Sequence, residues 1–281
     1  MFNKKTAIIT GGASGIGRAL AYELCARGAI VIIADRQAET GNQACAEISE
    51  AFPKARIGFE TLDVSHFEEV DRLVKRVVDQ HGRLDLMFNN AGVAVGGYAE
   101  DYLPEDWGRV FRVNIDGVAH GVHCALAVMR KQKSGHIVNV ASAAGLIPSP
   151  FAVAYTASKH AVVGLSRALR PEAKMRGVCV SVVCPGVVRT PILAAGGEFG
   201  RMASDIPTDV VMENWEKGGP VSAEKSARII LKGVLKNREI IMVPGKIGLL
   251  WRVERFFPSF LTRHIFKQGR KAFGDPTTPL G

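Results

Sequence analysis

Short apolar runs alternate along the chain with longer segments in which apolar residues recur at helical spacing. The short runs are rich in Val, Ile and Leu and are soon followed by turn residues, which is typical of buried strands. We predict seven strands, at residues 5–10, 29–35, 56–63, 83–89, 135–142, 178–186 and 239–244. The periodic segments predict helices at residues 15–27, 38–51, 68–80, 105–130, 155–176 and 222–236.

The order of these elements indicates the fold class. Strands that alternate with helices form a parallel sheet with both faces covered, and right-handed crossovers make that sheet doubly wound. We therefore expect an α/β fold with a doubly wound, parallel, seven-stranded sheet over residues 1–245. Residues 193–219 form the longest stretch without clear periodicity, and segments of this kind are usually functional lids or disordered.

Composition agrees with a globular protein of this class. The 281 residues are 47% hydrophobic and 22% charged. We find no apolar stretch long enough to span a bilayer and no signal-peptide pattern at the N-terminus. The five cysteines form no CxxC pair and the histidines have no ligand spacing. We therefore expect free thiols, no metal site and a cytoplasmic location.

Positive charge is concentrated near the C-terminus. The formal net charge is +9, and residues 246–273 hold seven Lys or Arg and one acid, so they supply +6 of it. The rest of the chain is nearly balanced, which argues against nucleic acid as a partner. The apolar residues Leu249, Val253 and Phe256 lie at helical spacing in this segment. We expect residues 246–281 to form a basic, aromatic tail that either makes peripheral membrane contact through residues 246–273 or packs in an oligomer interface or over the substrate site.

Two candidate motifs follow the first two predicted strands, and ligands of doubly wound sheets bind at such strand ends. The sequence "TGGASGIG" at residues 10–17 opens a helix, where glycines allow close approach of a pyrophosphate and the helix N-terminus attracts it. Asp35 closes the second strand, where a carboxylate accepts hydrogen bonds from adenosine ribose hydroxyls. An ordinary structural turn is the alternative for each motif taken alone.

The sequence "YTASK" places Tyr155 and Lys159 four residues apart on a predicted helix, so that both side chains lie on one face. A nearby ammonium group stabilises a phenolate and lowers the phenol pKa from about 10. The pair can then serve as an acid and a base near neutral pH. Two unrelated polar residues on a helix surface are the alternative that the spacing alone leaves open.

Together the glycine motif, "NNAG" at residues 89–92, Ser142, "YTASK" and "PGVVRT" at residues 185–190 resemble the short-chain dehydrogenase/reductase family in order and spacing. The resemblance covers roughly residues 4–245. It implies a single-domain Rossmann fold, a homodimer or homotetramer, and hydride transfer between a nicotinamide cofactor and a secondary alcohol or ketone.

The same resemblance implies a catalytic tetrad of Asn114, Ser142, Tyr155 and Lys159. Tyr155 would be the general acid or base, and Lys159 would lower its pKa and bind the nicotinamide ribose. Ser142 would hold the substrate oxygen, and Asn114 would hold a water in a proton relay to Lys159. The implied cofactor-binding residues, besides Tyr155 and Lys159, are Gly11, Ser14, Gly15, Ile16, Gly17, Asp35, Arg36, Asp63, Val64, Asn90, Ala91, Gly92, Pro185, Gly186, Val188 and Thr190.

Asp35 favours NAD because a carboxylate at this position repels a 2′-phosphate. Arg36 leaves NADP open, since a guanidinium pairs with that phosphate. The expected substrate pocket is mostly apolar, which suggests a lipophilic substrate such as a steroid, a retinoid or a long-chain compound. Its predicted residues are Val93, Ser142, Ala144, Ile147, Phe151, Tyr155, Val187, Ile192, Leu193 and Met202.

Two other functions fit the same fold. A dinucleotide-sensing regulator without turnover does not need the tetrad, so the intact set argues against it. An epimerase or dehydratase usually has a larger C-terminal substrate domain, and the 36 residues after Gly245 can hardly supply one.

Overall fold

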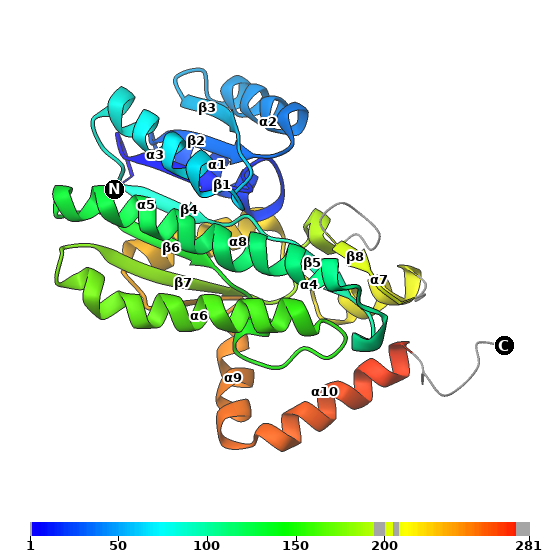
Figure 1. The fold of residues 1–281 in the computed structure, drawn as a ribbon. Coiled ribbons are helices and arrows are strands. Elements are labelled where there is room, and N and C mark those ends of the chain that lie inside the picture. Colours follow the sequence, from blue (N-terminus) through cyan, green and yellow to red (C-terminus); the bar gives the residue numbers. More distant parts are fainter. Residues whose placement is uncertain (1, 194–199, 205–207, 274–281) are drawn as a thin grey trace.

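The protein, described here by a computed structural model of residues 2–193, 200–204 and 208–273, is built on one large sheet. Seven strands run parallel in the order β3-β2-β1-β4-β6-β7-β9. Helices flank the sheet (Figure 1), so the predicted doubly wound α/β fold is confirmed. The strands are β1 (Thr6–Thr10), β2 (Ile30–Asp35), β3 (Arg56–Thr61), β4 (Leu86–Asn89), β6 (His136–Val140), β7 (Cys179–Pro185) and β9 (Ile240–Val243).

Each face of the sheet has its own hydrophobic core, because successive side chains of a strand point to opposite faces. In β2, Ile30 and Ile32 pack with the helices α3, α5 and α6, whereas Val31 and Ile33 pack with α1, α2 and α8. Both sets of residues are buried, which explains why the strand is a continuous apolar run. The helices are α1 (Gly15–Cys25), α2 (Ala38–Ala51), α3 (Phe67–His81), α5 (Gly117–Gln132), α6 (Val153–Lys174) and α8 (Ala223–Leu235).

The strand order reverses at β1, which lies between β2 and β4. Connections leave this point in opposite directions, and a crevice for ligands forms there at the carboxyl ends of the strands. The register pairs Ile9 of β1 with Phe88 of β4, so the glycine motif after β1 and the "NNAG" turn after β4 begin side by side.

One predicted helix is interrupted. Residues 105–130 were expected as one α-helix, but the structure has α4 (Pro104–Phe111), a π-helical segment η2 (Arg112–Asp116) and then α5. The backbone N–H of Gly117 donates to the oxygen of Arg112, five residues back. This wider turn contains the fully buried Asn114. Periodicity does not detect such a shift, because the residues on both sides keep a helical pattern.

The region 193–219 contains regular structure that its sequence does not indicate. The strand β8 (Gly200–Met202) pairs in parallel with β5 (Ala94–Gly96), and the helix α7 (Thr208–Lys217) follows it. The expectation of an irregular segment is therefore wrong for these residues. A strand of three residues is too short to show a period, and its pairing depends on a partner about a hundred residues earlier in the chain.

The chain continues past β9 into two helices, α9 (Ile247–Phe256) and α10 (Pro258–Phe273). Figure 1 shows α9 leaving the lower edge of the molecule and α10 running back from its far end. Ile247 is buried, and Trp251 and Ile265 pack against the core formed by α3, α5 and α6. Within the described residues, no helix is both long enough and apolar enough to cross a membrane. Residues 274–281 of the predicted tail lie outside the described part.

Candidate active site

The glycine loop after β1 is clamped to the turn after β4. The side-chain amide of Asn90 donates to the backbone oxygens of Thr10 (3.0 Å) and Gly11 (2.9 Å). In return, the Thr10 hydroxyl oxygen accepts from the backbone N–H groups of Asn90 (3.0 Å) and Ala91 (3.1 Å). Gly11 has a φ of +61°, and a Cβ there would lie 2.7 Å from the Cα of Ala91. Only glycine fits this approach.

The same loop opens α1 and meets the turn after β7. Ser14 is the N-cap of α1, and a Cβ on Gly17 would lie only 2.1 Å from the Gly11 oxygen. A Cβ on Gly15 would lie 3.0 Å from Cγ2 of Thr190. The structure therefore brings the predicted pyrophosphate loop and the predicted nicotinamide turn together. The first N–H groups of α1 and its dipole make this a suitable site for a pyrophosphate.

Acidic and basic groups meet at the predicted adenosine end. The buried Asp35 accepts hydrogen bonds from the backbone N–H groups of Ala13 (3.1 Å) and Gln37 (3.2 Å). Nη1 of the half-exposed Arg36 lies 3.8 Å from Oδ2 of Asp63. Burial alone would raise the pKa of Asp63, but hydrogen bonds from Ser65 and the charge of Arg36 outweigh it and lower the pKa. Arg36 thus already has a carboxylate partner.

Two other predicted cofactor residues pack into the protein. Val64 is buried in the main core, and its oxygen contacts Nδ1 of His120 at 2.9 Å. Ile16 is partly buried against the core on the α1 side.

Tyr155 and Lys159 lie on α6, with Nζ of Lys159 5.5 Å from the centre of the Tyr155 ring, as their spacing predicts. Nζ of Lys159 donates to the oxygen of Val140 at 3.0 Å, at the end of β6. The lysine is only 3% exposed, and burial lowers its pKa from 10.5 to about 8. The Lys159 amine is therefore mostly protonated, and so positively charged, at pH 7.

The Tyr155 phenol is linked to Ser142 by a hydrogen bond. Burial raises the pKa of Tyr155 above its ordinary value of about 10, and the hydrogen bond with Ser142 offsets only part of the rise. The predicted lowering of the phenol pKa by Lys159 is thus not produced by the protein's own groups. Removal of the phenol from water is the largest cause of the rise.

Asn114 is fully buried, and its side chain is committed to protein partners. Its oxygen accepts from the backbone N–H of Val93 (2.9 Å), and its amide donates to the oxygen of Val93 (2.9 Å) and to the hydroxyl of Ser158 (3.0 Å). A Cβ on Gly92 would lie 3.3 Å from both Oδ1 of Asn114 and Nζ of Lys159. These contacts fix the "NNAG" turn beside Lys159, and the predicted water relay remains a prediction.

The turn after β7 contains the predicted nicotinamide contacts. The N–H of Gly186 donates to the oxygen of Val243 at 2.7 Å, and Val188 is buried and bridges to Val221. The hydroxyl of Thr190 donates to the oxygen of Val188 at 3.4 Å, and the oxygen of Pro185 accepts from Ser142 at 3.5 Å. These bonds hold the turn next to the Tyr155–Ser142 pair.

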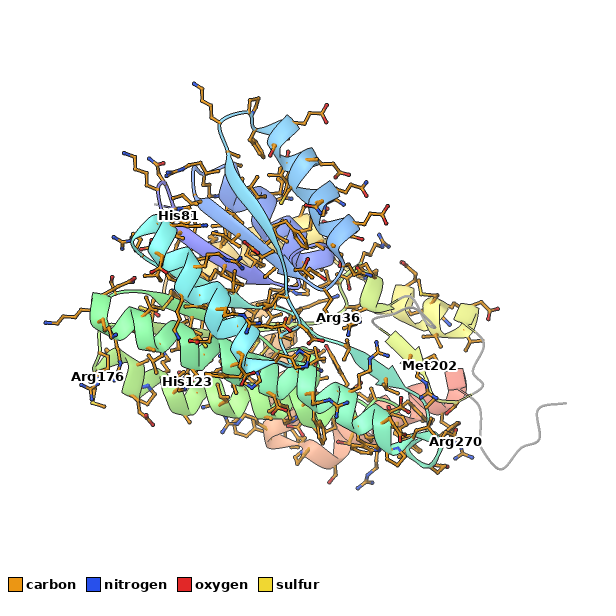
Figure 2. All side chains as sticks on the ribbon, turned by 45° about the horizontal axis from the view of Figure 1, so that its top comes forward. Arg36, His81, His123, Arg176, Met202 and Arg270 are labelled. Atoms are coloured by element: carbon orange, nitrogen blue, oxygen red, sulfur yellow. The ribbon has the colours of Figure 1, made fainter. Side chains whose placement is uncertain are left out.

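Aromatic residues gather around Phe151 on the predicted substrate side. The Phe151 ring meets Tyr98 edge-on, with centroids 5.3 Å apart, and stacks on Phe266 of α10 at 6.1 Å. Met202 of β8 lies against Gly96, whose missing Cβ would be 2.8 Å from its sulfur. Figure 2 shows Met202 on the side of the molecule where α10 carries Arg270.

The other predicted substrate residues lie in several different surroundings, and some of them are buried in the core. The N–H of Ala144 donates to the Ser142 hydroxyl at 3.1 Å, so Ala144 lies at the reacting end. Ile147 is buried in the main core and Val93 in a small cluster with Val95 and Tyr102. Val187 and Ile192 are partly exposed after β7, and the side chain of Leu193 lies outside the described residues.

Besides Tyr98, four contributors to this region were not predicted as site residues. Thr10 begins the glycine motif, so its position is a usable signal. Ser158, inside "YTASK", binds Asn114. Cys184 has an electrostatic interaction with Lys159, and burial raises the pKa of its thiol to about 12, which keeps it neutral. Phe266 gives no sequence signal, because it is 115 residues away from its ring partner Phe151.

Comparison with known proteins agrees with this geometry. Residues 5–198 match the family model for short chain dehydrogenases. D-beta-hydroxybutyrate dehydrogenase of Cupriavidus necator is 34% identical over 209 residues, which cover 74% of this chain and 80% of that protein. The NAD(+)-type 15-hydroxyprostaglandin dehydrogenase of Rattus norvegicus is 32% identical over 267 residues, covering 92% and 97%. A short-chain dehydrogenase/reductase from Burkholderia phymatum, solved in complex with NAD, superposes with a TM-score of 0.82 at 30% identity over 100% of this chain and 99% of that one.

A Rossmann-type sheet with this crevice and these strand-end residues defines a dinucleotide-dependent oxidoreductase. The chain belongs to the short-chain dehydrogenase/reductase family. Its reaction is a hydride transfer between a nicotinamide cofactor and an alcohol or a ketone.

Proposed function

We propose that this protein is an NAD-dependent dehydrogenase that interconverts a lipophilic secondary alcohol and its ketone. One observation carries the proposal. Ser142, Tyr155 and Lys159 converge at the carboxyl end of the sheet, beside the glycine loop and the turn after β7. An acid–base group, a hydrogen-bond donor for an oxygen and a fixed cation thus lie in one crevice.

The residues present fit a dinucleotide. Gly11, Gly15 and Gly17 leave space that a Cβ would fill, at the N-terminus of a helix that favours phosphate. Asp35 lies at the end of β2 to accept from a ribose hydroxyl, and Asn90 fixes the glycine loop. A bound oxidised nicotinamide would supply the hydride acceptor, and its positive charge would favour a phenolate nearby.

Proton transfer is assigned to the phenol of Tyr155. In oxidation its oxygen takes the proton of the substrate hydroxyl, while Ser142 holds the substrate oxygen in place. Lowering a phenol pKa from about 10 to about 7 requires roughly 4 kcal/mol of differential stabilisation. Because burial raises the Tyr155 pKa without a cofactor, the protein alone does not supply this stabilisation, and we assign it to the Lys159 ammonium acting together with the cationic cofactor.

We favour NAD over NADP because Asp35 occupies the ribose position and Arg36 is paired with Asp63. The rat relative's name and the Burkholderia complex both refer to NAD, which supports this choice. The test compares kcat/KM for the two cofactors with one alcohol. A clear preference for NADP would contradict the assignment.

The lipophilic substrate is supported by the aromatic cluster of Tyr98, Phe151 and Phe266 and by Met202. Two relatives are named for a short and a long hydroxylated acid, hydroxybutyrate and a hydroxyprostaglandin. We would therefore screen secondary alcohols of increasing chain length by absorbance of the reduced nicotinamide. Long-chain alcohols should give the higher kcat/KM. Turnover of small polar polyols alone would refute this part.

The variant Phe266→Ala separates a substrate wall from a structural contact. It should raise KM for the long-chain alcohol and leave KM for a short one within about twofold, because only the longer chain would reach α10.

Turnover itself decides against a non-catalytic regulator, and oxidation of an alcohol decides against an epimerase or dehydratase. The expected homodimer or homotetramer is measured by light scattering.

A further inference from the structure

The outer face of α9 and α10 is unusually apolar for a surface. Three of the four exposed phenylalanines of the described residues lie there, namely Phe256, Phe257 and Phe260, whereas the fourth, Phe266, stacks on Phe151. Phe256, Phe257 and Phe260 are 78%, 64% and 68% exposed and surround the corner between the helices. Leu249 lies seven residues before Phe256, about two turns earlier on the same face of α9, and is 66% exposed. Exposed apolar groups gathered in this way mark an interaction surface.

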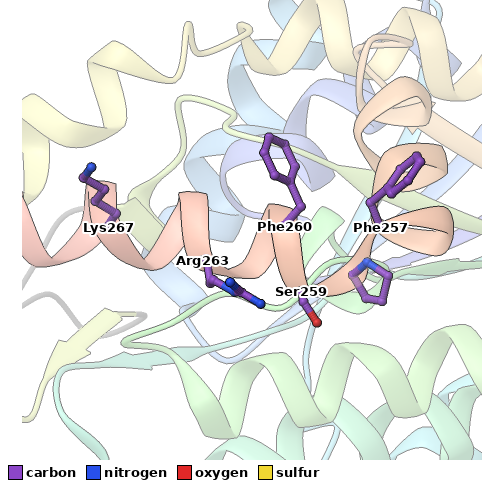
Figure 3. A pocket seen from close by; sticks show the side chains of 6 residues that line it. Phe257, Ser259, Phe260, Arg263 and Lys267 are labelled. Carbon is purple, nitrogen blue, oxygen red and sulfur yellow. The ribbon is translucent and has the colours of Figure 1, made fainter.

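A basic stripe continues from this apolar corner. Arg263, Lys267 and Arg270 follow Phe260 at intervals of three, four and three residues, so the four positions lie toward one half of α10, with the Arg263 side chain directed away from the side that carries Phe260 and Lys267 (Figure 3). The three basic side chains are exposed. Glu254 is the only acid between residues 246 and 273. The surface therefore suits an anionic partner.

A groove of about 530 Å³ joins the aromatic and basic groups. Figure 3 shows the rings of Phe257 and Phe260 on the same side of the helix pair, with Lys267 farther along α10 on that side. Apolar rings beside cations match the two parts of a phospholipid, since acyl chains favour the rings and the phosphate favours the cations. The groove is lined by Phe257, Pro258, Ser259, Phe260, Arg263 and Lys267.

The inner face of the same helices is held by the body of the protein. Trp251 and Ile265 pack against the main core, and Phe266 stacks on Phe151. Arg255 lies over the Trp251 ring at 5.5 Å. Anchoring on one side fixes the orientation of the other, and Figure 1 shows the corner between α9 and α10 at the lower edge of the molecule.

We propose that this outer face docks in the plane of an anionic lipid bilayer. A second copy of the chain is the competing occupant, but a twofold contact would set the two basic stripes against each other, and like charges repel. Anionic headgroups instead neutralise the stripe while the phenylalanines enter the acyl boundary. The proposal does not depend on the substrate or the cofactor proposed above.

The test uses the full chain and two kinds of sedimenting vesicle, phosphatidylcholine alone and phosphatidylcholine mixed with phosphatidylserine. The wild type should bind the anionic vesicles and be released by salt. Arg263→Glu with Lys267→Glu should lower the partition coefficient by at least about 25-fold, roughly fivefold for each cation lost. Phe256→Ser with Phe257→Ser should lower it about tenfold or more.

The matched control makes the same kinds of change elsewhere. Met175→Ser with Arg176→Glu alters an exposed apolar and an exposed basic residue after α6, and Figure 2 shows Arg176 and Arg270 at opposite ends of the molecule. This variant should bind like the wild type, and unchanged thermal melting of all three variants shows that they are folded. Equal binding to both vesicle types, or equal loss in the control, overturns the proposal. The proposal is also overturned if the wild type binds no vesicles and instead forms an oligomer that dissociates in the variant Phe256→Ser with Phe257→Ser.

Discussion

Replacing Lys159 with methionine should abolish activity and at the same time make the protein more stable. The lysine is almost fully buried, and its pKa is lowered from 10.5 to about 8. This shift corresponds to about 3 kcal/mol of destabilisation of the folded state below pH 8. The hydrogen bond to the oxygen of Val140 returns about 1 kcal/mol. Methionine fills a similar volume without a charge, so the expected net gain at pH 7 is about 2 kcal/mol.

The pH dependence of that gain tests its cause. Because the pKa is lower in the folded protein, the unfolded chain binds more protons between pH 8 and 10.5, and the wild type loses stability as pH falls through this range. The advantage of Lys159→Met should therefore be full below pH 8, shrink as the pH rises to 10.5 and become a deficit of about 1 kcal/mol above it, where only the lost hydrogen bond to Val140 still counts. Urea denaturation across this range measures the difference, and at pH 7 the melting temperature should rise by about 4–8 °C.

The control is Lys174→Met, at the exposed end of the same helix, which should change stability by less than about 1 kcal/mol at every pH. The activity of Lys159→Met should fall by at least about a hundredfold, because the amine orients the cofactor and supports the phenolate. A variant that is less stable than the wild type at pH 7, or whose stability difference does not vary with pH, would refute the reasoning.

Three further predictions concern single residues. Ser142→Ala should move the acidic limb of the kcat/KM profile for alcohol oxidation to higher pH, because the hydrogen bond with Ser142 lowers the pKa of Tyr155, which must be deprotonated to act as the base; an unchanged profile would count against that bond. Asp35→Asn should raise the kcat/KM ratio of NADP to NAD by about tenfold or more, since one negative charge near the 2′-phosphate is lost; an unaltered ratio would remove Asp35 from cofactor selection. Burial lowers the pKa of His136 to about 4, so the wild type should lose up to about 3 kcal/mol as pH falls from 6.5 to 4, and His136→Gln should show a flatter acid limb in urea denaturation. If the free energy of unfolding falls equally in the wild type and in His136→Gln between pH 6.5 and 4, His136 is already protonated in the folded protein.

The pattern of apolar residues predicts the sheet because its main strands are buried on both faces. The residues of β2 are all apolar except the last, and the exception, Asp35, is the one whose carboxylate binds the backbone of the glycine loop at Ala13. The pair Tyr155 and Lys159 is also visible in the sequence, since four residues on a helix determine which side chains meet. Local rules of this kind need no knowledge of distant partners.

Other parts of the site depend on contacts that are distant in sequence. Asn114 turns inward because the π-helical segment and the backbone of Val93 hold it there, and neither leaves a periodic signal. Phe266 reaches Phe151 only because α9 and α10 fold back over the body. The spacing of Tyr155 and Lys159 gives the neighbour of the phenol but not its burial, which raises the phenol pKa in the protein without a cofactor.

The central claim is that the Tyr155 hydroxyl transfers the proton in a crevice that also holds the dinucleotide. The most direct test is Tyr155→Phe, with NAD affinity measured by titration and kcat measured on the best alcohol found. The account predicts an NAD dissociation constant within about threefold of wild type and a kcat at least several hundred-fold lower, on the order of what a positioned acid–base group contributes. Near-normal turnover by Tyr155→Phe would contradict it.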